Sequence, residues 1–129
     1  VGRLFTEIDV YFGRGPRGRD IVYRPDAFFL RSARITANMR RLVQPPDVAI
    51  EIVSKTSPRR DYEAKKNDYE WFGVPEYWLV DPEEETMIFY RLQEGHYITV
   101  VAEGDLYRSE AIPGFVLNCA RVREAYRLP

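Results

Sequence analysis

Two acidic residues in predicted strands and one lysine in a predicted helix carry the chemistry that this sequence suggests. Asp26 follows Pro25, Glu51 lies inside the apolar run 47–54, and Lys65 interrupts the apolar stripe of the next helix. Carboxylate oxygens are the ligands that Mg²⁺ prefers, and a nearby ammonium group can stabilise the negative charge that develops during phosphoryl transfer. If the three groups meet, they form the minimum parts of a metal-dependent site that cleaves phosphodiester bonds.

The helix that carries Lys65 is predicted to run from Pro58 to about Phe72. Ser57 is expected to be its N-cap with Pro58 at the first helical position, and Gly73 fits the C′ position. At 100° per residue, one arc of about 80° contains Lys65 and three aromatic residues, Tyr62, Tyr69 and Phe72. Lys65 therefore points toward the sheet, and Lys66 lies on the more exposed side. The alternative is a lysine whose stem packs while its tip reaches solvent.

Glu51 needs a partner from outside its own strand. The run 47–54 is almost continuously apolar and predicts a central strand buried on both faces. Asp47 shares a face with Glu51 but lies roughly 13 Å away along the strand, so the two cannot bind one ion. Asp47 is better interpreted as an acid at a turn or strand start. The available partner is Asp26, although Pro-Asp is also common in turns, and Glu51 could instead be a buried acid paired with an arginine.

The remaining pattern predicts a mixed sheet with few helices, of the α/β (α+β) class, in a single domain over residues 1–129. The helix at 58–72 separates two strands and indicates a crossover between parallel neighbours, whereas the early strands are expected to be antiparallel. Residues 31–44 could be a loop or a short helix, and the tail 116–128 a short strand or helix. The expected strands cover residues 4–12, 21–30 (interrupted by Pro25), 47–54, 76–80, 87–92 and 97–102.

Composition excludes several classes of protein. The single cysteine, Cys119, excludes an internal disulfide and a multi-cysteine zinc site, and it is expected in the core of a cytoplasmic protein. His96, the only histidine, leaves nothing from which to build a histidine-based triad. No apolar run approaches the roughly 20 residues that span a bilayer, so no membrane association is expected.

Charge is distributed unevenly along the chain. Residues 1–66 carry 14 basic and 8 acidic residues, whereas residues 67–129 carry 5 and 12. The expected site therefore lies in the half that would attract a polyanion. Nine arginines there are either phosphate contacts or an ordinary solvated surface: Arg14, Arg17, Arg19, Arg31, Arg34, Arg40, Arg41, Arg59 and Arg60.

Four motifs follow one another along the chain: Arg24-Pro25-Asp26, Pro45-Pro46-Asp47-x-x-x-Glu51-x-x-Ser54, Asp61-x-x-x-Lys65-x-x-x-Tyr69 and Gly73-Val74-Pro75-Glu76-Tyr77-Trp78-Leu79-Val80-Asp81-Pro82. In this order they resemble the Uma-two family of restriction-endonuclease-like proteins, in the PD-(D/E)XK nuclease superfamily. The resemblance covers nearly the whole chain, and Ile112-Pro113-Gly114-Phe115 also fits the family's ending.

This resemblance implies a restriction-endonuclease-like core with Asp26 and Glu51 as metal-binding acids. The usual superfamily motif places a lysine two residues after the glutamate, where this chain has Val53. In the family the lysine function has moved to the helix, which maps onto Lys65, and Tyr69 would pack beside it as support. The resemblance also implies a longer N-terminal region with a helix and an acidic residue, so the domain over residues 1–129 is expected to be N-terminally incomplete relative to the family and to lack that helix.

The leading hypothesis is therefore a Mg²⁺-dependent endonuclease, a hydrolase of ester bonds that acts on DNA, with Asp26, Glu51 and Lys65 as catalytic residues. Mn²⁺ could replace Mg²⁺. Because two cuts in a duplex call for two active sites, a homodimer is one expectation by analogy. The alternatives are a non-catalytic module that binds nucleic acid or protein on the same fold, and a structural domain that oligomerises through its strand edges.

Overall fold

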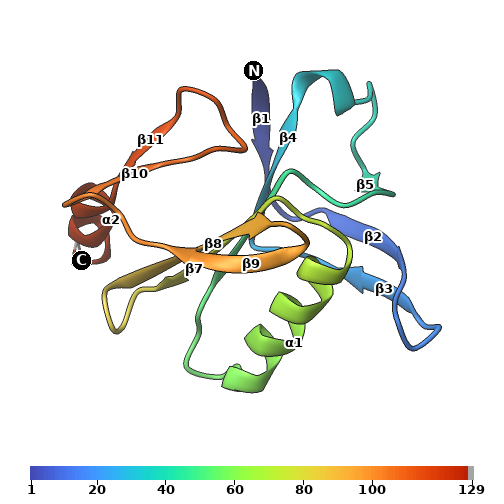
Figure 1. The fold of residues 1–129 in the computed structure, drawn as a ribbon, viewed down its shortest axis with the longest axis horizontal. Coiled ribbons are helices and arrows are strands. Elements are labelled where there is room, and N and C mark those ends of the chain that lie inside the picture. Colours follow the sequence, from blue (N-terminus) through green and yellow to red (C-terminus); the bar gives the residue numbers. More distant parts are fainter. Residues whose placement is uncertain (128–129) are drawn as a thin grey trace.

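A six-stranded mixed sheet forms the centre of the protein in this computed structural model, which describes residues 1–127 (Figure 1). Its strands lie in the order β1-β4-β6-β7-β8-β9, and only β6 and β7 are parallel neighbours. The mixed α+β class expected from the sequence is confirmed. The strands are β1 (Gly2–Phe5), β4 (Ala27–Arg31), β6 (Val48–Ile52), β7 (Glu76–Asp81), β8 (Thr86–Gln93) and β9 (His96–Val100).

Smaller elements surround this sheet. One three-stranded sheet has the order β3-β2-β5, and β10 pairs with β11. None of the helices within residues 1–127 is long and apolar enough to cross a bilayer. The surrounding strands are β2 (Asp9–Arg14), β3 (Asp20–Tyr23), β5 (Arg41–Leu42), β10 (Leu106–Arg108) and β11 (Val116–Asn118), and the helices are η1 (Ser32–Arg34), α1 (Arg59–Trp71) and α2 (Cys119–Tyr126).

Two expected strands are each divided in the structure. The strand expected over residues 4–12 is two strands, β1 and β2, because the chain turns at Glu7, where φ is 56°. The strand expected over 21–30 is divided into β3 and β4 around Pro25, as the proline indicated. The undecided segment 31–44 contains η1 and the short β5. The tail contains both a strand and a helix, and its residue Leu128 lies outside the described residues.

The crossover that positions the site runs from β6 through α1 to β7. Gly73 ends α1 as expected: its φ is 74°, its N–H donates to the Glu70 carbonyl, and the Val74 N–H donates to the Tyr69 carbonyl. The expected start was wrong by one residue. Pro58 is the N-cap residue, without a capping side chain, and Ser57 instead accepts a hydrogen bond from the Ser54 hydroxyl at 3.0 Å.

Both faces of the central sheet are covered, as the apolar run at β6 predicted. The face toward α1 buries Ala49, Tyr69 and Tyr77 together with phenylalanines from β1, β2 and β4. The other face packs against β10, β11 and α2, and it buries Trp78 and Cys119. Cys119 is therefore a core residue, as expected. Strand alternation places Glu51 on the same face as Ala49, so its carboxylate is directed toward α1.

Candidate functional site

Glu51 is a buried acid in the middle of the sheet. It lies on β6, between β4 and β7, and only 1% of its surface is exposed. A buried carboxylate is costly unless donors surround it. Two side chains from α1, which runs along this face of the sheet, supply those donors.

Tyr69 and Lys65 reach the two oxygens of this carboxylate. The Tyr69 hydroxyl donates to Glu51 Oε2 at 2.6 Å, and Lys65 Nζ donates to Oε1 at 3.2 Å. The Lys65 side chain is 23% exposed, and its Nζ lies 5.6 Å and 5.9 Å from the ring centroids of Tyr23 and Tyr62. Lys65 therefore turns its charge inward, which contradicts the alternative of a tip in solvent.

The neighbouring lysine behaves differently from the sequence expectation. Lys66 was expected on the more exposed side of the helix, but it is half-buried, and its Nζ lies 4.4 Å from the centroid of the Tyr90 ring. The aromatic surface of β8 accounts for this, because a long lysine side chain packs readily against it. Lys66 is thus held on another side of α1, away from Glu51.

Opposing influences set the pKa of the Glu51 carboxyl. Burial raises this pKa most, and the negative charge of Asp26 raises it further. The hydrogen bond from Tyr69 lowers it, as do the charge and the hydrogen bond of Lys65. The net result is a raised pKa. Burial and the Glu51 charge also raise the pKa of Tyr69, which therefore stays protonated and donates. The donors reduce the cost of the buried carboxylate without removing it.

Asp26 approaches the same place from the neighbouring strand. It lies between Pro25 and β4, and its Oδ2 accepts a hydrogen bond from the Ile52 N–H at 2.6 Å. This contact fixes the start of β4 against the end of β6. Unlike Glu51, Asp26 is exposed to solvent.

One pocket of about 380 Å³ brings the three predicted residues together. Asp26, Glu51 and Lys65 line it between the β3–β4 connection, the end of β6 and the first half of α1. The expected convergence is thus present in the structure, whereas the roles of the three side chains stay predictions. Further polar residues in the lining are Tyr23, Arg24, Ser54, Ser57, Asp61 and Tyr62.

Sequence reasoning did not assign a role to Tyr62 or Asp61. Tyr62 accepts a hydrogen bond from the Ser54 N–H at 3.0 Å and donates to the Ile52 carbonyl at 3.4 Å, which holds the end of β6 against α1. The helical arc had placed Tyr62 beside Lys65, but only the structure shows what its hydroxyl contacts. Asp61 had appeared only as the first residue of the motif Asp61-x-x-x-Lys65-x-x-x-Tyr69.

Asp47 is a structural acid, as its distance from Glu51 indicated. It is buried, its Oδ1 lies 2.7 Å from Arg34 Nη1, and its Oδ2 accepts from the Arg31 N–H at 2.8 Å. Arg34 also donates to the Pro45 carbonyl. These contacts tie η1 to the start of β6. Two of the nine arginines considered as phosphate contacts therefore serve the fold, since Arg31 Nε also lies 3.3 Å from the Asp47 carboxylate.

Comparisons with known proteins agree with this architecture. A family model described as "Uma2: Putative restriction endonuclease" matches residues 2–120. Among solved structures, a crystal structure described as "a putative nuclease belonging to DUF820" from Anabaena variabilis ATCC 29413 has a TM-score of 0.78 and 24% identity, and the match covers 98% of this chain and 70% of that chain. No curated protein matches. The structural likeness concerns the fold, over nearly the whole chain.

Proposed function

The chain belongs to the Uma2 family of restriction-endonuclease-like proteins, and we propose that it is a metal-dependent nuclease that hydrolyses phosphodiester bonds, with DNA as its substrate. The single observation that supports this most is the convergence of Asp26, Glu51 and Lys65 on one pocket. Family and fold point to a nuclease. The pocket supplies the residue types that such a reaction needs.

The donor set fits a hard divalent cation. The carboxylates of Asp26 and Glu51 would hold Mg²⁺, or Mn²⁺ in its place, because both are oxygen ligands in one pocket and the charge of each is unfavourable to the other. Within residues 1–127, no three acidic, histidine or cysteine side chains are grouped for metal binding. The remaining ligands would therefore be water, backbone carbonyls or substrate oxygens, which Mg²⁺ commonly keeps. When bound, the ion supplies Lewis-acid polarisation of the phosphoryl group and a lowered pKa of bound water.

Lys65 provides a fixed positive charge at the edge of the pocket. Its Nζ is held by Glu51 and by two aromatic rings, so little reorganisation is needed before it interacts with a phosphate oxygen. It would orient the attacking water or stabilise the additional negative charge of the transition state. Tyr69 acts through Glu51, by fixing the orientation of its carboxylate, and is a positioning residue.

A plasmid-nicking assay with Mg²⁺ or Mn²⁺ tests this proposal. Glu51→Ala and Lys65→Ala should each abolish nicking, whereas Lys66→Ala should leave it unchanged because Lys66 packs on Tyr90 outside the pocket. Circular dichroism of each variant checks that the fold is kept. Nicking that survives both substitutions would reject the assignment of these residues. Salt-sensitive DNA binding without any cleavage, unaffected by metal, would instead indicate a non-catalytic module.

Isothermal titration with Mg²⁺ provides a second readout that does not depend on turnover. The wild-type protein should bind the ion, and Asp26→Ala or Glu51→Ala should weaken that binding strongly. If the titration shows the same binding in the wild-type protein and both variants, Asp26 and Glu51 are not the metal ligands.

A further inference from the structure

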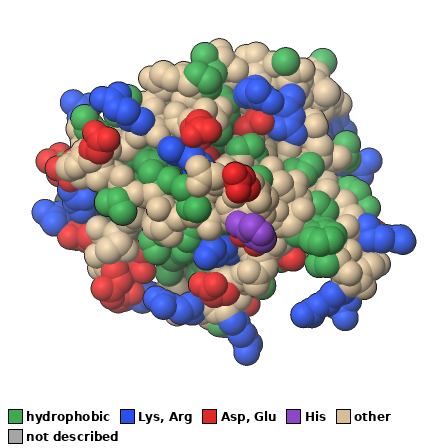
Figure 2. Space-filling view, in the orientation of Figure 1, with side chains coloured by type: hydrophobic (Ala, Val, Ile, Leu, Met, Phe, Trp, Pro, Cys, Tyr) green, Lys and Arg blue, Asp and Glu red, His purple; other side chains and the backbone are tan. Residues whose placement is uncertain are grey.

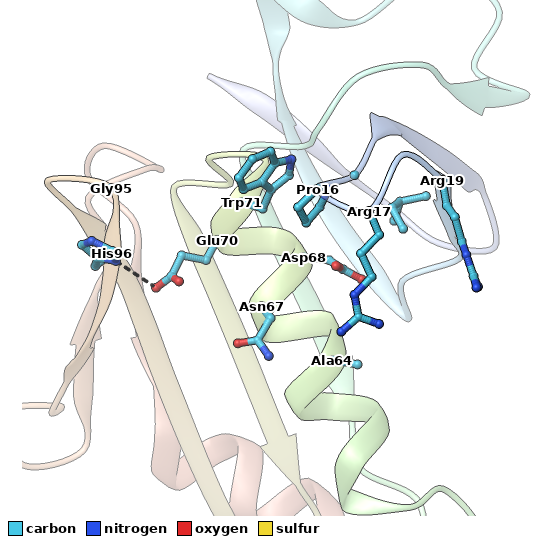
Figure 3. Close-up of a pocket in the computed structure, with 12 residues that line it drawn as sticks. Pro16, Arg17, Arg19, Ala64, Asn67, Asp68, Glu70, Trp71, Gly95 and His96 are labelled. Carbon is cyan, nitrogen blue, oxygen red and sulfur yellow. Dashed lines mark ion pairs between the residues drawn. The ribbon is translucent and has the colours of Figure 1, made fainter.

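A second hollow adjoins the candidate active site along α1. It has a volume of about 530 Å³ and lies between the β2–β3 loop and the exposed side of the helix (Figure 3). Ala64 lines both this hollow and the pocket of Glu51, so the two lie on either side of one position of α1.

The acidic residues of this hollow accept hydrogen bonds from within the protein, whereas its arginines form no ion pair. Asp68 accepts a hydrogen bond from the Tyr23 hydroxyl at 2.5 Å, and Glu70 accepts from the Tyr97 N–H at 2.7 Å. Arg17 and Arg19, by contrast, form no ion pair with any residue in the described part of the chain. The exposed guanidinium groups on the β2–β3 loop are therefore free to contact an anion, whereas the carboxylates on α1 are held by hydrogen bonds within the protein.

An exposed aromatic surface lies beside these charges. Trp71, in the last turn of α1, is 59% exposed. It lines the same hollow as Pro16 and Arg17 of the β2–β3 loop, and Figure 3 shows the Arg17 side chain extending alongside α1. In the space-filling view, basic side chains gather at the tip of the β2–β3 hairpin, across the hollow from α1 (Figure 2). Stacking on an aromatic ring, combined with cations that contact the backbone, is how proteins bind single-stranded nucleic acid.

We propose that this hollow is a subsite for an unpaired strand of nucleic acid, in which a base stacks on Trp71 while Arg17, on the facing β2–β3 loop, contacts the backbone phosphates beside it. The choice of ligand rests on the proposed nuclease function. Trp71 lies six residues beyond Lys65, about 9 Å along the helix axis and, at 100° per residue, on another side of the helix. A base can stack on Trp71 only where it is unpaired, so a locally unpaired segment is the preferred substrate.

Binding is measured without cleavage, in EDTA, with a short fluorescein-labelled oligothymidine and with a duplex of matched length. Trp71→Ala should weaken binding of the single strand by at least about fivefold, the lower end of measured base-stacking effects, and Trp71→Phe should restore most of it. Arg17→Ala should weaken binding of both ligands and make the salt dependence for the single strand shallower by about 0.7 in slope. Arg121→Ala removes an exposed arginine from α2, outside this hollow, and should change neither.

Tryptophan fluorescence gives an independent check. The other tryptophan, Trp78, is only 4% exposed, so quenching by oligothymidine should come from Trp71 and disappear in Trp71→Phe. Quenching that persists in that variant would count against stacking at this position.

The results separate this subsite from the proposed reaction. The proposed subsite is refuted if Trp71→Ala and Arg17→Ala bind the single strand as tightly as the wild-type protein does. It is also refuted if the wild-type protein does not bind the single strand at all. Both conclusions hold even when Glu51-dependent nicking is observed. If Trp71→Ala weakens duplex and single-strand binding equally, the stacking of an unpaired base is also wrong. Binding of the single strand that depends on Trp71, in a protein that cleaves nothing, would support the subsite and overturn the nuclease.

Discussion

Removing the Tyr69 hydroxyl tests whether Glu51 is an ionised carboxylate held by donors. Tyr69 and Glu51 are 0% and 1% exposed, and the hydroxyl lies 2.6 Å from Oε2. Phenylalanine at position 69 keeps the ring that stacks on Phe12 and meets Tyr77 edge-on. The substitution therefore deletes one hydrogen bond to a buried carboxylate and leaves the aromatic packing in place.

The expected cost follows from the kind of hydrogen bond that is lost. A hydrogen bond to a charged group contributes about 1.5 to 3 kcal/mol to the free energy of unfolding. For a domain of this size, a loss of about 2 kcal/mol lowers the melting temperature by roughly 5 to 10 °C. This loss should apply at pH values where Glu51 is ionised.

The pH dependence of that loss has a definite sign. The pKa of Glu51 is raised in the folded protein, so the stability linked to its protonated form is present below the unfolded value of 4.5 and is lost as pH rises through the folded pKa. The Tyr69 hydrogen bond lowers this pKa, so Tyr69→Phe raises it further. The difference in stability between wild type and variant should therefore be small at acidic pH and grow as pH rises.

Urea unfolding of Tyr69→Phe from pH 4, below the unfolded value of 4.5, to pH 8 measures this, and Tyr77→Phe is the matched control. Tyr77 is also buried, but its hydroxyl has no hydrogen-bond partner among the described residues. Removing that hydroxyl should leave stability unchanged or slightly increased, without pH dependence over this range. Equal losses in both variants, or a loss in Tyr69→Phe that does not grow with pH, would refute the interpretation of Glu51.

Three further substitutions test contacts that hold the fold around the site. Arg34→Ala should lower the free energy of unfolding by about 3 kcal/mol in urea titrations, because it removes a partner from the buried carboxylate of Asp47. Glu76→Ala should cost at least about 3 kcal/mol, because several donors lose their acceptor, and limited proteolysis should then cut first near residues 107–111. Gly73→Ala should cost about 1 kcal/mol in melting experiments from backbone strain alone, since φ is 74° and no atom lies near the added Cβ.

Local periodicity was sufficient to predict the helix and the direction of Lys65. The 100° advance per residue places Lys65 and Tyr69 one turn apart on one face, and their neighbours on that face are apolar. The same reasoning found Glu51, because a charged residue within an otherwise apolar strand stands out. The prediction for Asp26 was weaker, because Pro-Asp is equally typical of a turn. What joins Asp26 to β6 is the hydrogen bond from the Ile52 N–H, a contact between residues far apart in the sequence.

Glu76 shows what the sequence alone could not reveal. It begins a predicted strand and was assigned no role, yet it is 0% exposed. Its Oε2 accepts hydrogen bonds from the Ser109 hydroxyl at 3.0 Å and from the Ala111 N–H at 2.6 Å, and Tyr107 donates to Oε1. These partners lie more than thirty residues away, in the short strand β10 and the loop that follows it, so no local pattern marks the contact.

The end of β6 agrees with the expectation that a catalytic lysine lies on the helix rather than on the strand. The expected strand position is Val53, where β6 has already ended, and Val53 lines a separate hollow with Asp81 and Glu83 and not the pocket of Asp26 and Glu51. On α1, residues four apart lie on one face, so Lys65 and Tyr69 reach both oxygens of the same carboxylate. Because burial raises the pKa of Glu51 and these donors only partly offset it, the carboxylate remains a group that a further cation would stabilise.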